Sequence, residues 1–496
     1  MITVTGTSKS FGDKQLLDDI NFSLDNEVVG LIGNNGSGKT TILKILSGEL
    51  LSDKGNIQKG DEVIHYLPQY PDFKELTVRD FLTSKLVNPS DNYKIEIALQ
   101  SLGLSKIDKN QPANSLSGGQ KTKLHLASLL LTNSTTLLLD EPTNNLDMHG
   151  LIWLEKFIKD FKGNILLVSH DRALLDNTVD RIIELKDGKI KKYGGNYSFY
   201  REQKLAEEKS QLEKYKENTE EVARLEKLIS DKKERARRLS KDTKPTRDND
   251  KFAANFFSQR SIKIDRQAKA VESRLGHLEK LEKPKERISF PFGFEGQVHS
   301  DKFILGCKNI SKNYNDKVVL QDISFSISGN QHIWLSGTNG SGKTTLLNIL
   351  AKKLQPDKGN IEIGNNVKIG YFSQETSQLD INKTGIEELI LTGTSETDCF
   401  KYAMNLHLNP SDLRKPISQL SRGQIAKLEF IKLLIGKNHI LILDEPTNHL
   451  EVETREEIEE ALKNYQGAIL VISHDRYFLE EIGISKSYEL KAGKLN

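Results

Sequence analysis

The sequence predicts an α/β protein with two copies of one domain, joined by a long helical linker. Three observations support this prediction: the same motifs occur twice, short apolar runs alternate with helical patterns, and the stretch between the halves is highly charged. We expect a first domain at residues 1–198, a helical linker at 199–290 and a second domain at 291–496. The two domains are called the first copy and the second copy.

Four short motifs occur in both halves of the chain in the same order. "GNNGSGKTT" at 33–41 recurs as "GTNGSGKTT" at 337–345, and "LSGGQ" at 116–120 recurs as "LSRGQ" at 420–424. "LLLDEPTNNLD" at 137–147 recurs as "LILDEPTNHLE" at 441–451, and "LLVSHDR" at 166–172 recurs as "LVISHDR" at 470–476. Because equivalent positions such as Lys39 and Lys343 are 304 residues apart in every pair, the chain contains a tandem duplication.

The apolar runs within each copy are short and continuous, as in strands that are buried on both faces. Runs such as "VVGLIG" at 28–33 and "TTLLLD" at 135–140 are bounded by glycine or acidic residues. They alternate with helical patterns such as "SGGQKTKLHLASLLLT" at 117–132. This alternation predicts a parallel sheet in each copy.

Composition limits the cellular setting. The chain has a formal net charge of +2, with 36% hydrophobic and 28% charged residues. No run approaches the roughly 18 consecutive apolar residues that cross a bilayer, and the N-terminal "MITVTGTSKSFGDKQ" lacks the apolar stretch of a secretory signal. Cys307 and Cys399 lie too far apart in the sequence to suggest a metal motif. We therefore expect a cytoplasmic protein without disulfides.

The repeated glycine-rich motif predicts a phosphate site in each copy. It follows a predicted strand and precedes a predicted helix, which is the setting of a P-loop. Glycines let backbone N–H groups turn toward phosphate oxygens, and the helix adds its positive end. The lysines would reach the β and γ phosphates, and the following threonines would offer hydroxyls to Mg²⁺. The expected contacts are Gly33, Asn34, Asn35, Gly36, Ser37, Gly38, Lys39, Thr40 and Thr41, with Gly337, Thr338, Asn339, Gly340, Ser341, Gly342, Lys343, Thr344 and Thr345 in the second copy.

Residues that follow further apolar strands predict the hydrolytic chemistry. An aspartate at a strand end can bind Mg²⁺ or its waters, the next glutamate can deprotonate the attacking water, and a histidine after another strand can contact the γ phosphate. These are the metal ligands Asp140 and Asp444, the catalytic Glu141 and Glu445, and the catalytic His170 and His474. Alone, each P-loop match could be a glycine turn without a ligand, and each histidine a structural residue. Two complete sets in register favour the catalytic interpretation.

Both copies resemble ATP-binding cassette (ABC) nucleotide-binding domains, whose signature motif is "LSGGQ". The aromatic residue on which adenine stacks is matched by Phe11 in "SKSFGDK" and Tyr314 in "SKNYNDK". Without the repeat, a core aromatic would be an equal alternative for Phe11. The resemblance implies ATP and Mg²⁺ as cofactors and ATP hydrolysis as the activity. It adds contacts from the signature residues Ser117, Gly118, Gly119, Gln120, Ser421, Arg422, Gly423 and Gln424, and from Gln69 and Gln374, which also approach the metal.

In the ABC family two cassettes pack head to tail, and each ATP lies between the P-loop of one and the signature of the other. By resemblance, site one combines the P-loop and catalytic residues of the first copy with Ser421 and Gly423. Site two combines those of the second copy with Ser117 and Gly119. Because both sites keep their glutamate and histidine, both are expected to hydrolyse ATP.

Two departures put the equivalence of the two sites in doubt. Arg422 replaces the first glycine of the signature, although Ser421 and Gly423 remain on either side of it. Glu451 stands where the first copy has Asp147, which is expected to alter communication between the sites.

The linker predicts a helical hairpin. Residues 200–240 read as one long polar helix without proline or glycine. Two narrow apolar stripes with steps of three and four residues suit antiparallel helices that bury only the seam between them. The stripes are Leu205, Leu212, Tyr215, Val222, Leu225 and Ile229, followed by Ile264, Ala268, Val271, Leu275 and Leu278.

Positive charge gathers where the hairpin is expected to turn. Between residues 232 and 269 there are 13 Lys and Arg residues against 5 Asp and Glu, and "KPTRDNDKFAANFFSQR" at 244–260 is expected to form a loop. Basic residues interleaved with aromatics suit RNA phosphates and unpaired bases. The alternatives are a solvated charge run and phenylalanines packed on the end of the hairpin. The RNA contacts predicted for this tip, near residues 240–262, are Lys241, Lys244, Arg247, Lys251, Phe252, Phe256, Phe257 and Arg260.

Tandem cassettes with a charged helical linker resemble the ABC-F family, and the likeness covers nearly all 496 residues. ABC-F proteins bind the ribosome in the tRNA exit site, and the linker tip reaches toward the peptidyl-transferase centre. The resemblance implies 23S rRNA and P-site tRNA as partners, no membrane or transmembrane partner, and a monomeric chain whose cassettes pair with each other.

The branch of the family remains open. Housekeeping translation factors often carry an arm inserted in the first cassette, between the Q-loop glutamine (Gln69 here) and the signature. The distance from Gln69 to Leu116 is 47 residues and that from Gln374 to Leu420 is 46, so the first copy has no such insertion. With no such arm, no long C-terminal extension and a long linker tip, the chain looks like the antibiotic-resistance branch, which displaces drugs from the large ribosomal subunit. The ATPase subunit of a transporter is the alternative from another class, and a DNA-repair ATPase is disfavoured by the short hairpin.

Overall fold

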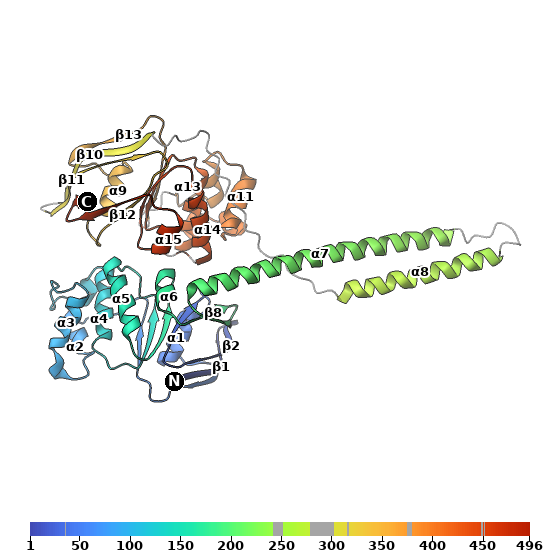
Figure 1. Cartoon of the computed structure of the whole chain (residues 1–496), viewed down its shortest axis with the longest axis horizontal. Helices are drawn as coiled ribbons and strands as arrows, with labels where there is room; N and C mark the ends of the chain where they lie inside the picture. Colours follow the sequence, from blue (N-terminus) through green and yellow to red (C-terminus); the bar gives the residue numbers. More distant parts are fainter. Residues whose placement is uncertain are drawn as a thin grey trace. The chain divides into compact units, whose positions relative to one another are not determined.

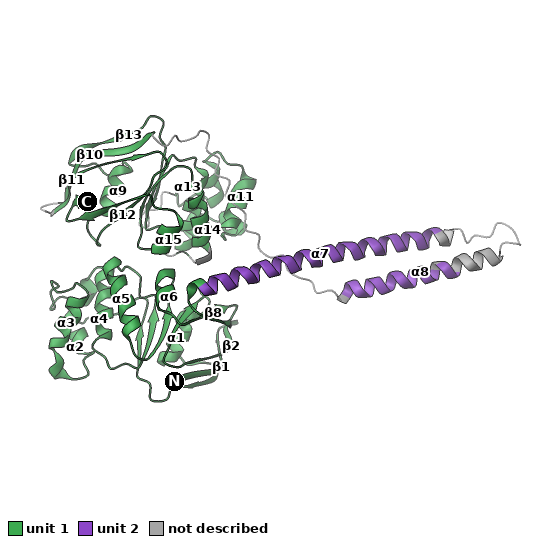
Figure 2. Cartoon of the chain, in the orientation of Figure 1, with its two compact units in different colours: residues 1–198, 288–496 green, residues 199–287 purple. Residues whose placement is uncertain are grey.

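The computed structural model describes residues 1–34, 36–241, 251–277, 302–314, 317–373, 379–447, 450 and 452–496. They fall into two compact units, one from residues 1–198 and 288–496 and the other from residues 199–287 (Figure 2). The first unit holds both copies of the duplicated domain, and the second is helical. The predicted fold class, two α/β copies with a long helix between them in the sequence, is confirmed.

Each copy contains a small antiparallel sheet and a larger, mainly parallel sheet (Figure 1). In the first copy, the small sheet has the order β2 (Lys14–Leu24), β1 (Ile2–Phe11), β4 (Lys54–Gln58). The large sheet has the order β5 (Ile64–Leu67), β6 (Thr136–Asp140), β7 (Asn164–Val168), β3 (Val28–Ile32), β8 (Arg181–Lys186), β9 (Lys189–Gly194).

The second copy repeats both strand orders. Its small sheet runs β11 (Lys317–Ser328), β10 (Phe303–Tyr314), β13 (Lys358–Ile363). Its large sheet runs β14 (Ile369–Ser373), β15 (Ile440–Asp444), β16 (Ala468–Ile472), β12 (His332–Ser336), β17 (Lys486–Lys491), β18 (Lys494–Leu495). The duplication read from the motifs therefore extends to the whole topology.

The central strands of the large sheets are apolar because helices cover both faces. Every residue of β6, β7, β15 and β16 is buried. In the parallel register Asp140 lies opposite Val168, and Asp444 lies opposite Ile472. The polar residues that follow these strands therefore emerge beside one another on one side of each sheet.

Equivalent helices surround the two large sheets. The first copy has α1 (Lys39–Ser47), α2 (Val78–Thr83), α3 (Tyr93–Ser101), α4 (Gly118–Leu129), α5 (Met148–Asp160) and α6 (Arg172–Thr178). The second has α9 (Lys343–Leu350), α10 (Gly385–Ile390), α11 (Glu396–Asn405), α12 (Pro410–Leu413), α13 (Arg422–Ile435), α14 (Val452–Lys463) and α15 (Arg476–Glu481).

Two equivalent ion pairs join the copies. Arg172 at the start of α6 donates a hydrogen bond of 2.8 Å from Nη1 to Oε2 of Glu459 on α14, and its Nη2 contacts the other carboxylate oxygen. Arg476 at the start of α15 pairs with Glu155 on α5. Because residues 172 and 476, and 155 and 459, are related by the repeat of 304, the two contacts are the two halves of a pseudo-twofold interface.

The second unit contains two long helices, α7 (Tyr197–Lys241) and α8 (Lys251–His277). Glu221 pairs with Arg274 at 3.0 Å, and farther along α7 Lys232 donates to Gln267 at 3.0 Å. Since the partners on α8 run backward as α7 runs forward, the predicted antiparallel hairpin is confirmed. Across the parts of the chain that the structure describes, no helix is long and apolar enough to cross a membrane.

The apolar seam of the hairpin is narrow. Leu225 of α7 and Ala268 of α8 are buried, whereas Leu205 is 44% exposed. Leu205 was expected in the seam, but the described ion pairs between the helices join α8 to the later part of α7, at Glu221 and Lys233. Leu278 lies outside the described residues.

The prediction of a loop at residues 244–260 is wrong for residues 251–260, because α8 begins at Lys251. Phe252, Phe256 and Phe257 thus lie in the first two turns of a helix. Residues 251–277 contain no proline and only one glycine, Gly276, so helix propensity continues through the aromatic stretch that was read as a break.

Candidate functional site

The glycine-rich loop of each copy joins a central strand to a helix, as predicted for a P-loop. It leads from β3 to α1 in the first copy and from β12 to α9 in the second. Gly38 and Gly342 have φ values of 111° and 102°, in the left-handed region that favours glycine. A Cβ atom at Gly337 would lie 2.5 Å from the carbonyl oxygen of Leu490, so this turn has no room for a side chain.

The loop lysines lie inside their own loops. Lys39 Nζ donates hydrogen bonds to the carbonyl oxygens of Gly33 at 2.7 Å and Asn34 at 3.0 Å. Lys343 Nζ makes the equivalent bonds to Gly337 at 2.7 Å and Thr338 at 3.1 Å. Each ammonium group is therefore fixed at the mouth of a glycine cradle, where it suits an anionic ligand. Asn35 lies outside the described residues.

Two of the three predicted magnesium ligands of the first copy lie together. Thr40 Oγ1 donates a 2.8 Å hydrogen bond to Asp140 Oδ2, and burial raises the pKa of Asp140. Mg²⁺ prefers oxygen ligands and usually takes the rest of its shell from water and substrate phosphates. The described residues contain no group of three or more His, Cys, Asp or Glu residues that could hold a metal alone.

The remaining predicted metal ligands are less fully described. Gln69 follows the end of β5 by two residues and is partly buried. Thr344 begins the first turn of α9, and Asp444 ends β15, as their counterparts do in the first copy. Gln374 lies outside the described residues.

The two predicted catalytic glutamates have a strained backbone. Glu141 and Glu445 have φ values of 51° and 48°, a region that costs a residue with a side chain about 1 to 3 kcal/mol. Their N–H groups donate to the neighbouring strand, Glu141 to Val168 O at 2.8 Å and Glu445 to Ile472 O at 2.9 Å. These bonds hold the backbone of the two glutamates at the same point in each copy.

Each glutamate faces the predicted histidine of its own copy. The distance from His170 Nε2 to Glu141 Oε1 is 3.4 Å, and the distance from His474 Nε2 to Glu445 Oε1 is also 3.4 Å. Burial raises the pKa of Glu141 to about 7 and that of Glu445 to about 8. Burial lowers the pKa of both histidines, that of His474 to about 4. A glutamate that titrates near neutrality beside a neutral imidazole suits proton transfer.

The signature motifs form helix caps. The hydroxyl of Ser117 accepts from the N–H of Gln120, and the Gln120 side chain accepts from the N–H of Ser117 at 3.1 Å. Ser421 and Gln424 form the same capping box at the start of α13. These contacts fix the positive end of each signature helix and its serine, a combination that attracts phosphate.

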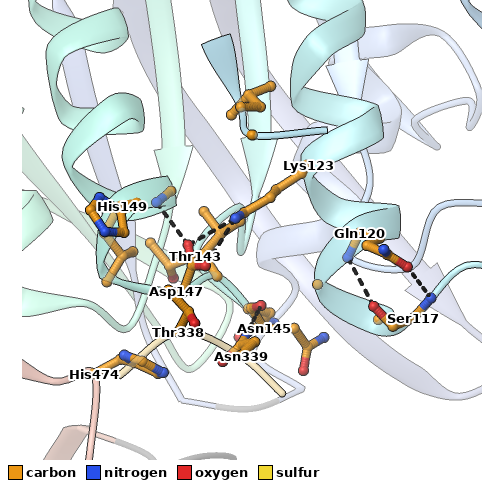
Figure 3. Close-up of a pocket in the computed structure, with 18 of the residues that line it drawn as sticks. Ser117, Gln120, Lys123, Thr143, Asn145, Asp147, His149, Thr338, Asn339 and His474 are labelled. Carbon is orange, nitrogen blue, oxygen red and sulfur yellow. Dashed lines mark hydrogen bonds and ion pairs between the residues drawn. The ribbon is translucent and has the colours of Figure 1, made fainter. Parts of the chain in front are cut away.

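One cavity of about 940 Å³ brings the first signature to the second P-loop (Figure 3). Its lining includes Ser117, Gly118, Gly119 and Gln120 from the first copy, with Thr338, Asn339, Gly340, Glu445 and His474 from the second. Asn339 Nδ2 donates a 3.1 Å hydrogen bond to Asn145 O, which joins the second P-loop to the segment that follows β6 of the first copy. Ser117, Gly119, Glu445 and His474, which were expected in site two, line this cavity, whereas Lys343 and Asp444 are not part of its lining. The volume is typical of a small-molecule site.

Asp147 links the same cavity to the helix behind it. Its carboxylate pairs with Lys123 at 2.9 Å and caps α5 by accepting from the N–H of Gly150 at 3.0 Å. Burial alone would raise the pKa of Asp147, but these two donors lower it. The charged aspartate therefore stays fixed beside the second P-loop.

Fewer of the residues expected in site one line this cavity. Glu141 and His170 line the cavity, but its lining includes none of Ser421, Arg422, Gly423 and Gln424. Arg422 is exposed at the start of α13. Glu451, the other departure noted in the sequence, lies outside the described residues.

The predicted adenine-stacking residues end equivalent strands, Phe11 in β1 and Tyr314 in β10. They are 52% and 49% exposed, so neither is the core aromatic that was the alternative. Lys9 Nζ lies 5.7 Å from the centre of the Phe11 ring, and Lys312 Nζ lies 6.0 Å from that of Tyr314. Both rings are open to stacking by a planar base.

Six of the eight residues predicted to contact RNA lie within the described helices of the hairpin. Lys241 ends α7, Lys251 begins α8, and Arg260 of α8 is exposed. Phe252, Phe256 and Phe257 are placed on α8 by its backbone alone. Lys244 and Arg247 lie outside the described residues.

Sequence reasoning missed several residues that line or brace the site. Arg172 and Arg476 stand in the repeated "SHDR" motif. Their recurrence was a signal, but only the histidine of the motif was given a role. Asn145 contributes its backbone carbonyl oxygen, and every residue type has this group, so the residue's identity gave no signal. Arg455 lines the cavity, but the equivalent residue of the first copy is Leu151, so the repeat gave no sign of it.

Comparison with protein families agrees with this geometry. A family model described as ABC transporter matches residues 17–144 and 320–448, and a second model with the same description matches residues 183–292. The second match spans the hairpin, so the linker as well as the two copies resembles known sequences.

Similar curated proteins share almost the whole chain. A putative ATP-binding protein of Bacillus subtilis, YdiF, is 33% identical over 97% of this chain and 79% of its own length. The ATP-binding protein Uup of Escherichia coli is 31% identical over 97% and 79%. The ribosome protection protein VmlR of Bacillus subtilis is 31% identical over 98% and 86%.

A similar solved structure supports the fold. The structure titled RNase-L Inhibitor superposes with a TM-score of 0.66 and 19% identity, covering 99% of this chain and 90% of its own. At that identity the likeness concerns the arrangement of the chain and not its activity.

We expect Glu445→Gln to stabilise the ATP-free protein increasingly as the pH rises. Burial raises the folded-state pKa of Glu445 to about 8, so this carboxyl group ionises at a lower pH in the unfolded state than in the folded state. The free energy of unfolding therefore decreases between about pH 4.5 and 8. The loss amounts to ~1.4 kcal/mol per pH unit at most, and a neutral amide avoids it. Thermal midpoints of variant and parent at pH 5.5 and 8.5 measure the difference.

The matched control is Glu460→Gln, which makes the same change at an exposed position of the same copy. Its difference from the parent should not grow with pH. A constant difference for Glu445→Gln would contradict the assignment of a buried, protonated carboxyl group.

We expect Gly119→Ala to impair ATP hydrolysis far more than Gly118→Ala. A Cβ atom at Gly119 would lie 2.7 Å from Asn145 O and 3.3 Å from Asn339 Nδ2, so it must displace the carbonyl group that receives the second P-loop. A Cβ atom at Gly118 meets its nearest neighbour at an ordinary 3.5 Å. A displacement of this size costs about tenfold or more in rate. Steady-state ATPase assays of both variants make the comparison, and equal activities would refute the packing shown by the cavity.

Proposed function

Because the chain belongs to the ABC-F family of ATP-binding cassette ATPases and hydrolyses ATP, we propose that it uses this hydrolysis to act on the ribosome. In this proposal the chain enters the tRNA exit site and directs the end of its hairpin toward the peptidyl-transferase centre. Displacement of antibiotics from the large subunit is the proposed outcome.

The observation that carries the proposal is the hairpin with its basic end. Two helices of 45 and 27 residues are held in register by ion pairs along a thin seam, and the positive charge concentrates where they turn. A helix of that length spans roughly 65 Å. Such an extended, cationic element suits a target covered with phosphates.

A relative supplies the choice of target. VmlR carries the name ribosome protection protein, and it matches 98% of this chain, hairpin included. The other close relatives are named only as ATP-binding proteins, so a housekeeping role in translation is the second candidate.

The proposed cycle starts with ATP at both sites. The signature serine at the start of α4 and the lysine of the second P-loop would hold one nucleotide between the copies. Mg²⁺, held by Thr40 and Asp140 and their counterparts Thr344 and Asp444, would neutralise phosphate charge. Glu141 and Glu445 would each accept a proton from the attacking water, and His170 and His474 would contact the γ phosphate.

Closure of the two copies is proposed to favour the ribosome-bound form. The hairpin end would then shift the P-site tRNA or nearby rRNA and lower the occupancy of bound drugs. Hydrolysis would reopen the copies and release the protein.

The double variant Glu141→Gln and Glu445→Gln should remain on ribosomes in the presence of ATP. Without either carboxylate the bound nucleotide is not hydrolysed, so the closed form persists. Co-sedimentation of the full chain with ribosomes through a sucrose cushion measures retention. If the variant pellets no better than the parent in ATP, the proposed cycle is wrong.

Charge variants of this trapped protein locate the contact. Changing Lys241, Lys251 and Arg260 to Glu should reduce co-sedimentation and its dependence on salt, because phosphate contacts release counterions. The matched control reverses three exposed lysines earlier on α7, Lys209, Lys214 and Lys216, with the same change in net charge. Equal losses in the two sets would mean that the hairpin end has no special role.

Expression of the chain in a susceptible bacterium should raise the inhibitory concentration of at least one class of large-subunit drug. The classes to test are macrolides, lincosamides, streptogramins A, pleuromutilins and phenicols. The hairpin-end charge variant serves as the control and should give no protection. Ribosome binding without protection against any class would favour the housekeeping role.

A further inference from the structure

The two catalytic pairs lie in unequal surroundings, because one arginine has no counterpart. Arg455, in the first turn of α14, lines the cavity between the copies and is 8% exposed. The repeat of 304 residues pairs it with Leu151, which also lines the cavity. Leucine has no hydrogen-bond donor in its side chain, so Leu151 cannot give the second copy the hydrogen bond that Arg455 gives the first.

Arg455 reaches from the second copy into the first. Its Nε donates a 3.0 Å hydrogen bond to the carbonyl oxygen of Leu450 in its own copy, which anchors the side chain. Its Nη1 donates a 2.8 Å hydrogen bond to the carbonyl oxygen of His170 in the first copy. The same Nη1 lies 3.6 Å from Asp475 Oδ2, which also lies 3.7 Å from Arg172 Nη2.

The contact falls on the residue that faces the glutamate. The N–H of His170 donates to Glu141 Oε2 at 3.2 Å, and its Nε2 lies 3.4 Å from Glu141 Oε1. A guanidinium that holds the carbonyl of His170 therefore restrains both the backbone and the ring that meet Glu141.

We propose that Arg455 is a positioning residue supplied by the second copy, which holds His170 and Glu141 in place for hydrolysis at site one. The proposal rests on the assignment of these two residues to ATP hydrolysis. Site one then works only while α14 of the second copy stays docked on the first. Site two has Leu151 at this position, so its turnover does not depend on such a contact.

Arg455→Met tests the proposal in two single-site backgrounds of the full chain. Glu445→Gln leaves site one as the hydrolytic site, and Glu141→Gln leaves site two. In the Glu445→Gln background Arg455→Met should lower kcat for ATP by about tenfold to a hundredfold, the cost of slight misplacement of catalytic groups, with little change in KM. In the Glu141→Gln background kcat should change by less than about twofold.

Two further variants separate positioning from folding. Arg455→Lys keeps a donor and a charge and should restore part of the lost kcat. Lys463→Met removes an exposed cation from the same helix and should leave both backgrounds unchanged. An equal loss in both backgrounds, or no loss in either, overturns the proposal. Because the assay contains no ribosomes, its result is independent of the proposed ribosomal function.

Amide hydrogen exchange tests the same contact without ATP turnover, and it can be used even if neither single-site parent hydrolyses ATP. Arg455→Met should speed exchange of the amides at 169–171, where His170 N–H is bound by Glu141. Lys463→Met should leave these amides unchanged. Unaltered exchange in Arg455→Met would show that the guanidinium does not hold this segment, and the proposal would fail.

Discussion

The paired arrangement of the two copies depends on two arginines that each reach a glutamate of the other copy. The Arg172–Glu459 pair is almost fully enclosed, and the guanidinium also lies 4.3 Å from the centre of the Tyr477 ring. Removal of one member of such a pair leaves a buried charge and costs about 3 to 5 kcal/mol, so the pair acts chiefly to fix which surfaces meet. Because each arginine stands two residues after the histidine in the same motif, the segment that docks one copy on the other also carries the predicted catalytic histidine.

Much of the fold followed from the sequence because the duplication gave every motif an independent check. The parallel strands of each copy and the strand–loop–helix setting of Lys39 and Lys343 were predicted from short-range patterns and are found in the structure. Local chemistry determines these features: glycine at positive φ, and a carboxylate after a buried strand.

The sequence was least informative where a residue acts through space or through its backbone. Asn145 acts through its carbonyl oxygen, and Arg455 acts on a segment 285 residues away. The start of α8 was missed for a different reason. The basic, aromatic stretch from Lys251 was read by its surface chemistry, although a long run without proline continues the helix. Periodicity locates a buried stripe, but it does not locate the end of a helix that is mostly exposed.

The pseudo-twofold interface has a consequence for how such a protein can diverge. In a homodimer every substitution appears twice, so an arginine placed to serve one half must also serve the other. Here the two halves lie on a single polypeptide, and position 455 can carry arginine while position 151 carries leucine. Covalent linkage thereby frees the two nucleotide sites from identical selection. One half can specialise in timing while the other retains the ancestral chemistry.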